Sequence, residues 1–390
     1  MTALALLSLA IWLYLLALRG GFWRVAPDLL PAADERPQGA ATLPSVLAIV
    51  PARNEAEVIA ESLSSLLSQD YAGSLHVLLV DDHSDDGTAE AAQAAAQAAG
   101  RAERLTVIRS RPLPQGWTGK LFAMQEGLDW AAGRQAPPDF VLFADADIRF
   151  RKDILGRLAA LAIRRRTVLT SLMVKLKTVS LAKILLVPAF VFFFKMLYPF
   201  AWVRNPDRRV AAAAGGTMLV HRETLMEAGG LGAIRGALID DCALGALMKR
   251  RGPIWLGLTD EAFSIRAYPA FADIRRMVSR SAYAELRYSP LRLCVALLGL
   301  ALVFLVPPIA LVFAHGWGRL AGLAGWILMS AAFVPMLRFY RVPAIAAVLL
   351  PAIAALYAEF TINSAVEHSL GRGGAWKGRF QAQAGSGGKP

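Results

Sequence analysis

The chain has 390 residues, of which 56% are hydrophobic, and its mean hydropathy of +0.44 excludes an ordinary soluble domain. Lysine and arginine outnumber aspartate and glutamate by 42 to 30, which gives a net charge of +12. The basic residues form short, scattered clusters without a nucleic-acid-binding motif, so attraction to anionic lipid head groups explains them better than nucleic-acid binding.

The first apolar segment, Thr2–Leu18, contains no charged residue and is followed by Arg19 and Arg24. This pattern predicts a membrane-spanning helix whose carboxyl end faces the cytosol. A signal peptide is the alternative, but the segment has neither a basic region before it nor a clear small-residue cleavage site.

Three apolar runs of strand length follow, and each leads into a polar loop and then into a helix-like pattern. The runs are Val46–Val50, Leu75–Val80 and Leu105–Ile108. Alternating strands and helices predict an α/β, Rossmann-like fold with a mostly parallel sheet. Because ligands of such sheets bind beyond the carboxyl ends of the strands, we expect the polar loops to meet at one edge.

A fourth strand lies within Asp139–Asp147 and ends in two carboxylates, Asp145 and Asp147. Strand side chains two apart point to the same face, so both carboxylates can aim at one point where the apolar run stops. Such hard oxygen ligands suit Mg²⁺ or Mn²⁺, which complete their shells with water and substrate phosphates. Acidic pairs also end strands as helix caps or solvated turns, and the pair alone leaves that alternative open.

The apolar run Ile184–Trp202 contains Lys195 and two prolines and lies inside the region expected to form the α/β fold. A membrane crossing here would split that region between two compartments, so we interpret the run as lying in the membrane interface. A buried core helix is the alternative.

A second acidic pair, Asp240 and Asp241, follows the glycine-rich segment Gly229–Gly232. Leu244 and Leu247 then recur at helical spacing, so the pair opens a predicted helix. Adjacent carboxylates at a helix start are also ordinary capping residues, and the pattern by itself does not separate that role from a catalytic one.

The carboxyl-terminal part contains further candidate spans, of which Leu293–Ala314 is long enough to cross the hydrocarbon core. Leu320–Leu337 and Val342–Tyr357 are shorter. If all spans cross and the α/β region is cytosolic, the basic tail lies outside, against the positive-inside tendency. We therefore expect one of the two short segments to be re-entrant or interfacial.

Several motifs in order give the chain a specific resemblance to the family 2 glycosyltransferases of GT-A fold, over roughly residues 42–290. They are Val50–Glu55, Val80–Thr88, Gly119–Lys120, Asp145–Asp147 and Ile239–Leu244. Further segments resemble one subgroup, the hopanoid-associated glycosyltransferases of bacterial membranes. These are Gly116–Lys120, Pro188–Phe194, Ala211–Gly216, Leu286–Pro290 and Trp376–Arg379.

The resemblance implies a role for each motif residue. Asp241 would be the catalytic base, with Asp240 beside it, and Asp147, helped by Asp145, would hold Mg²⁺ or Mn²⁺ against the donor diphosphate. The implied nucleotide-sugar-binding residues are Pro51, Ala52, Asn54, Glu55, Asp81, Asp82, Lys120, Asp145, Arg287 and Tyr288. For Asp81 and Asp82 an acidic turn is the alternative, and for Lys120 a merely solvated lysine.

One motif departs from the family pattern. Processive synthases of this family carry Gln-x-x-Arg-Trp, whereas Ala284–Tyr288 stands at the corresponding place. Arg287 and Tyr288 still allow an approach to diphosphate and acceptor. The missing glutamine and tryptophan favour transfer of a single sugar to a small or lipid acceptor over long-chain synthesis.

Together these patterns predict a multi-pass enzyme of the bacterial cytoplasmic membrane. The resemblance implies that it would move one sugar, most simply from a UDP-sugar, to a hopanoid-like or isoprenoid lipid at the cytosolic face with inversion. The alternatives are a polyprenyl-phosphate sugar transferase and a non-catalytic membrane protein that keeps the fold for binding or assembly. The expected domains are an anchor at 1–24, a GT-A domain at 42–290 with the interfacial segment 184–202, transmembrane helices at 291–366 and a basic, disordered tail at 367–390.

Overall fold

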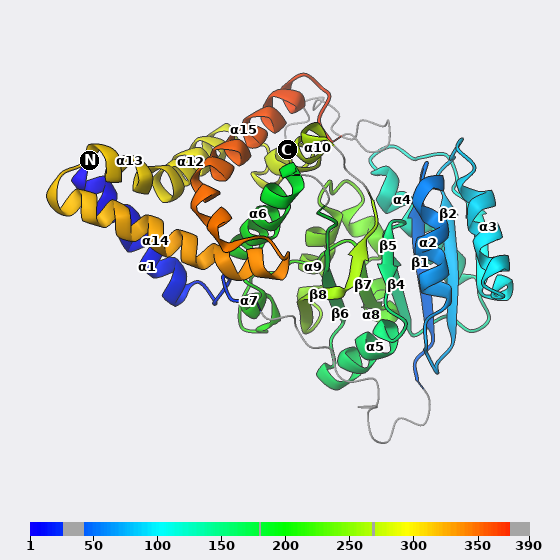
Figure 1. Cartoon of the computed structure of the whole chain (residues 1–390). Helices are drawn as coiled ribbons and strands as arrows, with labels where there is room; N and C mark the ends of the chain where they lie inside the picture. The colour runs from blue at the N-terminus through cyan, green and yellow to red at the C-terminus, as the bar shows by residue number, and fades with distance from the viewer. Residues whose placement is uncertain (26–42, 179–180, 267–269, 375–390) are drawn as a thin grey trace. The chain divides into compact units, whose positions relative to one another are not determined.

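The computed structural model describes residues 1–25, 43–178, 181–266 and 270–374 (Figure 1). These residues form two compact units. The α/β unit consists of the described residues of Ala26–Lys177 and Trp202–Arg266, and the helical unit of those of Met1–Val25, Thr178–Ala201 and Ala267–Pro390. Residues 270–290 fall in the helical unit, and the end of the GT-A domain at residue 290 stays a prediction.

An eight-stranded sheet organises the α/β unit, with the order β3-β2-β1-β4-β7-β6-β8-β5. The four strands predicted from the sequence are β1 to β4, and they pair in parallel. Strand β7 runs antiparallel to β4 and β6, so the sheet is mixed but mostly parallel, as predicted. The strands are β1 Val46–Ala52, β2 Leu75–Asp81, β3 Leu105–Arg109, β4 Phe140–Ala144, β5 Ile148–Phe150, β6 Leu169–Lys175, β7 Thr217–His221 and β8 Ile254–Ser264.

Helices cover the sheet at β1 and β4, because these two strands are apolar and buried at every position. Val46, Ala48 and Val50 of β1 belong to a core that α2 and α5 complete. Helix α4 covers β1 and β2 so closely that a Cβ on its Gly127 would lie 2.5 Å from Cγ2 of Ile49. The helices of this unit are α2 Ala56–Leu67, α3 Thr88–Ala98, α4 Gly119–Ala132, α5 Ile154–Arg165, α8 Arg222–Glu227 and α9 Asp240–Lys249; α7, Phe200–Arg204, spans the unit boundary.

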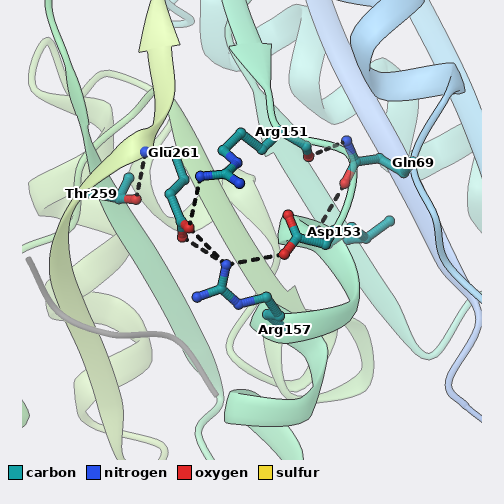
Figure 2. A network of polar contacts seen from close by, with 7 residues as sticks. Gln69, Arg151, Asp153, Arg157, Thr259 and Glu261 are labelled. Atoms are coloured by element: carbon teal, nitrogen blue, oxygen red, sulfur yellow. Dashed lines mark hydrogen bonds and ion pairs between the residues drawn. The ribbon is translucent and has the colours of Figure 1, made fainter. Parts of the chain in front are cut away.

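A polar network joins α5 to β8 (Figure 2). The guanidinium of Arg157 donates to both oxygens of Glu261 at 2.8 and 2.9 Å and to Asp153 at 3.2 Å. The amide of Gln69 donates to the carbonyl of Arg151 at 2.8 Å. Arg157 is 9% exposed, so its charge depends on these carboxylates for compensation.

We expect Arg157→Leu to destabilise the α/β unit by about 2–3 kcal/mol, because it leaves two carboxylates without their charged hydrogen bonds. Thermal unfolding of the full chain in detergent measures the loss. Arg151→Leu is the matched control, because Arg151 is 63% exposed and 3.6 Å from Glu261, and it should change stability by less than about 1 kcal/mol. Equal losses in the two variants would contradict a structural role specific to Arg157.

The helical unit contains three helices, within the described ranges, that are long and apolar enough to cross a membrane. They are Pro290–Phe313, Gly316–Phe339 and Ala344–Ser369, with 24, 24 and 26 residues. We expected the segments Leu320–Leu337 and Val342–Tyr357 to be short. This expectation is wrong, because the helices that contain them, Gly316–Phe339 and Ala344–Ser369, extend beyond the apolar runs. The helices of this unit are α1 Thr2–Leu18, α6 Leu181–Leu197, α10 Phe271–Ser279, α11 Ala282–Glu285, α12 Pro290–Leu300, α13 Val306–Phe313, α14 Gly316–Phe339 and α15 Leu350–Ser369.

Helix α6 carries most of the run for which we predicted a membrane-interface position. Its Phe192 is 1% exposed, and its ring packs against those of Phe22 and Phe333 within the helical unit. Phe193 likewise contacts Phe304 and Tyr357. Other helices therefore cover these rings, which agrees with the buried-helix alternative for Phe192, while the position of the segment in a membrane stays a prediction.

Residues 375–390, including Lys377, Arg379 and most of the predicted tail, lie outside the described residues.

A hydrogen bond ties the amino-terminal helix α1 to the break between α12 and α13. Pro307 has no N–H, so it cannot donate to the carbonyl of Val303, and a π-helical turn, Ala301–Leu305, occurs here. The indole of Trp12, which is fully buried, donates to this carbonyl at 2.8 Å. In lipid, where water is absent, such a carbonyl needs a protein partner.

Trp12→Phe should therefore lower the thermal stability of the chain in detergent, by about 1–2 kcal/mol, because the carbonyl of Val303 loses its donor. Tyr14→Phe removes a hydroxyl from a side chain on the same helix that is 49% exposed, and it should have no measurable effect. A Trp12 variant as stable as the wild type would show that the bond contributes nothing.

Candidate active site

The loops after β1, β2 and β4 meet at one edge of the sheet, because these neighbouring strands run in parallel. Pro51 and Ala52 end β1 and pair with Val80 and Asp81 of β2. The sequence-predicted residues Asn54, Glu55 and Asp82 follow directly in these loops, and Asp145 follows β4. The fold thus brings the predicted donor-binding residues of the α/β unit to one edge.

Hydrogen bonds fix the first two loops to each other. The N–H of Asn54 donates to the hydroxyl of Ser84 at 3.0 Å, and the N–H of Glu55 donates to that of Thr88 at 2.8 Å. Asn54 and His83 adopt left-handed backbone conformations, with φ of 51° and 56°. Such conformations are costly outside glycine and cluster at functional sites.

The acidic pair at the end of β2 is buried within these loops. Asp81 is 7% exposed, and its Oδ1 accepts the N–H of Ser84 at 3.2 Å. Asp82 is 1% exposed, accepts the hydroxyl of Ser110 at 3.1 Å and lies 3.7 Å from the guanidinium of Arg53. Both carboxylates shape the loop, and their contact with a nucleotide stays a prediction.

The carboxylate of Asp147 is held by the residues that end β8. Its Oδ2 accepts the hydroxyl of Ser264 at 2.6 Å and lies 3.4 Å from Nε of Arg266. Arg266 also pairs with Glu55. Sequence reasoning did not find Ser264 and Arg266; the only signal was two polar residues at alternate positions where β8 ends.

Lys120, at the start of α4, joins the two predicted acidic motifs. Its Nζ lies 2.9 Å from Oδ1 of Asp145 and 3.0 Å from Oδ2 of Asp240. Burial lowers the pKa of Lys120, but the charges of Asp145 and Asp240 outweigh this and hold the pKa above its usual value. Lys120 is therefore a cation shared by two carboxylates.

Asp241 lies in the first turn of α9, beside this ion-paired group. Its Oδ2 accepts the N–H of Gly215 at 2.9 Å, and its Oδ1 accepts the N–H of Cys242 at 2.7 Å. Burial, and secondarily the charge of Asp240, raises the pKa of Asp241 to about 6, against the lowering effect of Lys120 and the two N–H groups. A carboxylate with such a pKa can take up a proton near neutral pH.

The two carboxylates Asp145 and Asp147 fit a divalent cation. Burial raises the pKa of Asp145; the charge of Lys120 opposes this rise, and the charge of Asp147 adds to it. Among the described residues, Oδ2 of Asp145 and Oδ1 of Asp147 have no protein hydrogen-bond partner. These are hard oxygen donors, although no group of three or more potential ligand side chains is formed within the described part of the chain.

Arg287 and Tyr288 lie in the helical unit, between α11 and α12. Both have left-handed backbones, with φ of 52° and 53°. The ring of Tyr288 stacks on that of His368 at a centroid distance of 4.3 Å. Their predicted contact with diphosphate and acceptor stays a prediction.

The sheet and its carboxylate-bearing edge define a GT-A fold. A solved structure with this fold is the mannosyltransferase PcManGT from Pyrobaculum calidifontis in complex with GDP-Man and Mn²⁺. It aligns with a TM-score of 0.55 and 20% identity, over 94% of this chain and 98% of the other. Residues 47–227, just under half of the chain, match the family model described as Glycosyl transferase family 2.

Two curated relatives match shorter stretches, and both are named N-acetylglucosaminyltransferase. The protein from Rhizobium leguminosarum bv. viciae is 37% identical over 118 residues, which is 30% of this chain and 25% of the relative. The one from Bradyrhizobium sp. (strain ANU 289) is 49% identical over 55 residues, 14% of this chain and 36% of the relative. The chain therefore covers about a quarter to a third of these relatives.

Proposed function

We propose that the protein is a membrane-bound, inverting glycosyltransferase that moves a single sugar from a nucleotide-sugar donor to a lipid. The observation that carries this proposal is the grouping of Asp145, Asp240 and Asp241 around Lys120 at the strand-end edge of a family 2 domain. The three long apolar helices of the same chain support a membrane setting and an acceptor that is itself a lipid.

In the proposed reaction, Asp241 acts as general base. The acceptor hydroxyl oxygen bonds to the anomeric carbon of the donor sugar, the bond from that carbon to the diphosphate oxygen breaks, and the hydroxyl proton passes to Asp241. One displacement without a covalent enzyme intermediate inverts the configuration. The N–H groups of Gly215 and Cys242 hold the carboxylate in place for this transfer.

The donor site would lie at the ends of β1, β2 and β4. We propose that Asp147, with Asp145, holds Mg²⁺ or Mn²⁺, whose charge would neutralise the departing nucleoside diphosphate. Asp81 and Asp82 would contact the nucleoside, flanked by the loop from Pro51 to Glu55. Arg287 and Tyr288 would approach the diphosphate and the acceptor.

The finer assignments rest on the sequence resemblance. We propose a hopanoid or related isoprenoid acceptor, a UDP-sugar as the simplest donor, and a bacterial cytoplasmic membrane with the α/β unit on its cytosolic side. Arg19 and Arg24 after α1 favour this orientation. The relatives named N-acetylglucosaminyltransferase make N-acetylglucosamine the first sugar to test. A polyprenyl-phosphate acceptor is the second candidate, because it too is a lipid that transmembrane helices would present.

The test is transfer by the purified full-length chain in vesicles of total membrane lipid, supplied with Mn²⁺ and a panel of UDP- and GDP-sugars. Mass spectrometry should find one lipid class heavier by a single sugar, with one donor preferred. A product on a polyprenyl phosphate would select the second candidate. Donor binding without any glycosylated lipid would favour a non-catalytic role and overturn the proposal.

The pH dependence of the reaction follows from the pKa of Asp241. The group must be deprotonated to accept a proton, so kcat/KM should fall about tenfold per pH unit below about pH 6 and level off above it. Initial rates at subsaturating donor, measured from about pH 5 to about pH 8, give the profile. Activity that is flat through this range would show that no group with this pKa takes part.

A further inference from the structure

The position of Lys120 leads to an inference that rests on the proposed function and extends it. The sequence predicted that Lys120 binds the donor, yet its Nζ is within 3.0 Å of carboxylates from two different elements, Asp145 after β4 and Asp240 in α9. Its side chain is only 17% exposed. We infer that Lys120 is a positioning residue that fixes the base-bearing first turn of α9 against the metal-binding end of β4.

The ammonium group of Lys120 lies against Gly215, where any side chain at position 215 would be in tight contact with it. A Cβ on Gly215 would lie 3.2 Å from Nζ of Lys120 and 3.4 Å from Oδ2 of Asp241. Gly215 also donates its N–H to that same oxygen of Asp241. Lys120, Gly215 and the acidic pair therefore form one close-packed group, in which a shift of one member displaces the base.

The backbone that carries Lys120 is itself held firmly. Lys120 is in the first turn of α4, and this helix is pressed against β1 through the contact of Gly127 with Ile49. The N–H of Thr118, just before α4, donates to the carbonyl of Arg235 at 3.0 Å, in the segment that leads to α9. The lysine thus extends from a rigid element to a helix end that carries two adjacent carboxylates.

Charge balance explains why a cation is needed at this point. Asp240 lies close enough to repel both Asp145 and Asp241, and Lys120 is a cation that pairs with Asp145 and Asp240. Without it, repulsion would drive the first turn of α9 away from β4. A displacement of about 1 Å at a reacting group can cost about 100-fold in rate.

The experiment is a double-mutant cycle on the full-length chain in lipid vesicles, with Lys120→Met, Asp240→Asn and both changes together. We expect Lys120→Met to lower kcat about 100-fold while the donor KM changes by less than about threefold. The kcat of the double variant should be about tenfold higher than that of Lys120→Met, because Asp240→Asn removes the negative charge that Lys120 would otherwise neutralise. Lys152→Met, at an exposed lysine of the same unit, is the control and should match the wild type.

Two results would overturn the inference. A donor KM raised more than tenfold by Lys120→Met, with kcat nearly unchanged, would make Lys120 a donor ligand. Strictly multiplicative effects of the two changes on kcat would show that Lys120 and Asp240 act independently. If Lys120→Met does not fold, Gly215→Ala decides: it should lower kcat at unchanged donor KM, and wild-type kcat in this variant would also overturn the inference.

The same variants are compared by thermal unfolding without substrate. Lys120→Met should lower the melting temperature, and the added Asp240→Asn should restore part of the loss. This readout does not depend on sugar transfer. If the wild type transfers no sugar but the melting temperatures show coupling between Lys120 and Asp240, the proposed function is wrong and the positioning role of Lys120 is supported. If the wild type transfers sugar but the melting temperatures show no coupling, the positioning role is wrong and the proposed function is supported.

Discussion

Replacement of Asp241 by asparagine should lower kcat by about 10²- to 10⁴-fold and leave the donor KM nearly unchanged. Asparagine has almost the same shape, and its one carbonyl oxygen can still accept the N–H of Gly215, although the N–H of Cys242 then loses its acceptor. It cannot take up a proton, so the acceptor hydroxyl would attack without assistance. Initial rates over a range of donor concentrations measure both constants.

Asp207→Asn is the matched control, because it makes the same chemical change at an exposed residue of the α/β unit. Its kinetic constants should equal those of the wild type. If Asp241→Asn instead lost donor affinity and kept its turnover at saturation, Asp241 would belong to the donor site. The proposed base would then have to be another residue.

Replacement of Asp147 by asparagine should remove the gain in donor affinity that a divalent cation provides. The new amide would keep an oxygen for Ser264 but lose the charge that binds the cation, so the fold should survive. We expect UDP affinity in Mn²⁺ to fall by at least about 10- to 100-fold. Loss of a residue that only supports a metal ligand already has an effect of this size, and Asp147 would be a ligand itself. Calorimetric titration of the protein with UDP, once in Mn²⁺ and once in EDTA, measures the effect.

Thermal unfolding of the Asp147 variant without metal checks that the fold is kept. Its melting temperature should lie close to that of the wild type, since Arg266 retains Glu55 as a partner. The assignment would be wrong if wild-type UDP affinity were the same in Mn²⁺ and in EDTA.

The parallel half of the fold could be predicted because its strands are apolar runs bounded by polar loops. A loop and a helix lie between each two successive strands from β1 to β4. The alternation of strand and helix patterns in the sequence therefore predicts a parallel sheet. β6, β7 and β8 carry the sheet beyond β4 and include antiparallel pairs. Short apolar runs of this kind do not reveal by periodicity whether they are strand or helix, or in which direction they pair.

The candidate site could be predicted as a set of residues but not as a set of contacts. Asp145 and Asp240 are 95 positions apart in the sequence, and their common partner Lys120 precedes both, so only the fold shows that one ammonium joins them. Likewise, Arg266 pairs with Asp147 and Glu55 through the end of β8. A phenylalanine suits both a lipid-facing and a buried position, so the sequence could not show that Phe192 is buried against other helices.

The anomeric configuration of the transferred sugar tests the central claim most directly. The product lipid is formed by the full-length chain in vesicles from a donor of known configuration, and nuclear magnetic resonance reads the configuration of the new glycosidic bond. A single displacement assisted by Asp241 predicts that the bond is inverted relative to the donor. A product with retained configuration would require a covalent intermediate or another mechanism and would contradict the role proposed for Asp241.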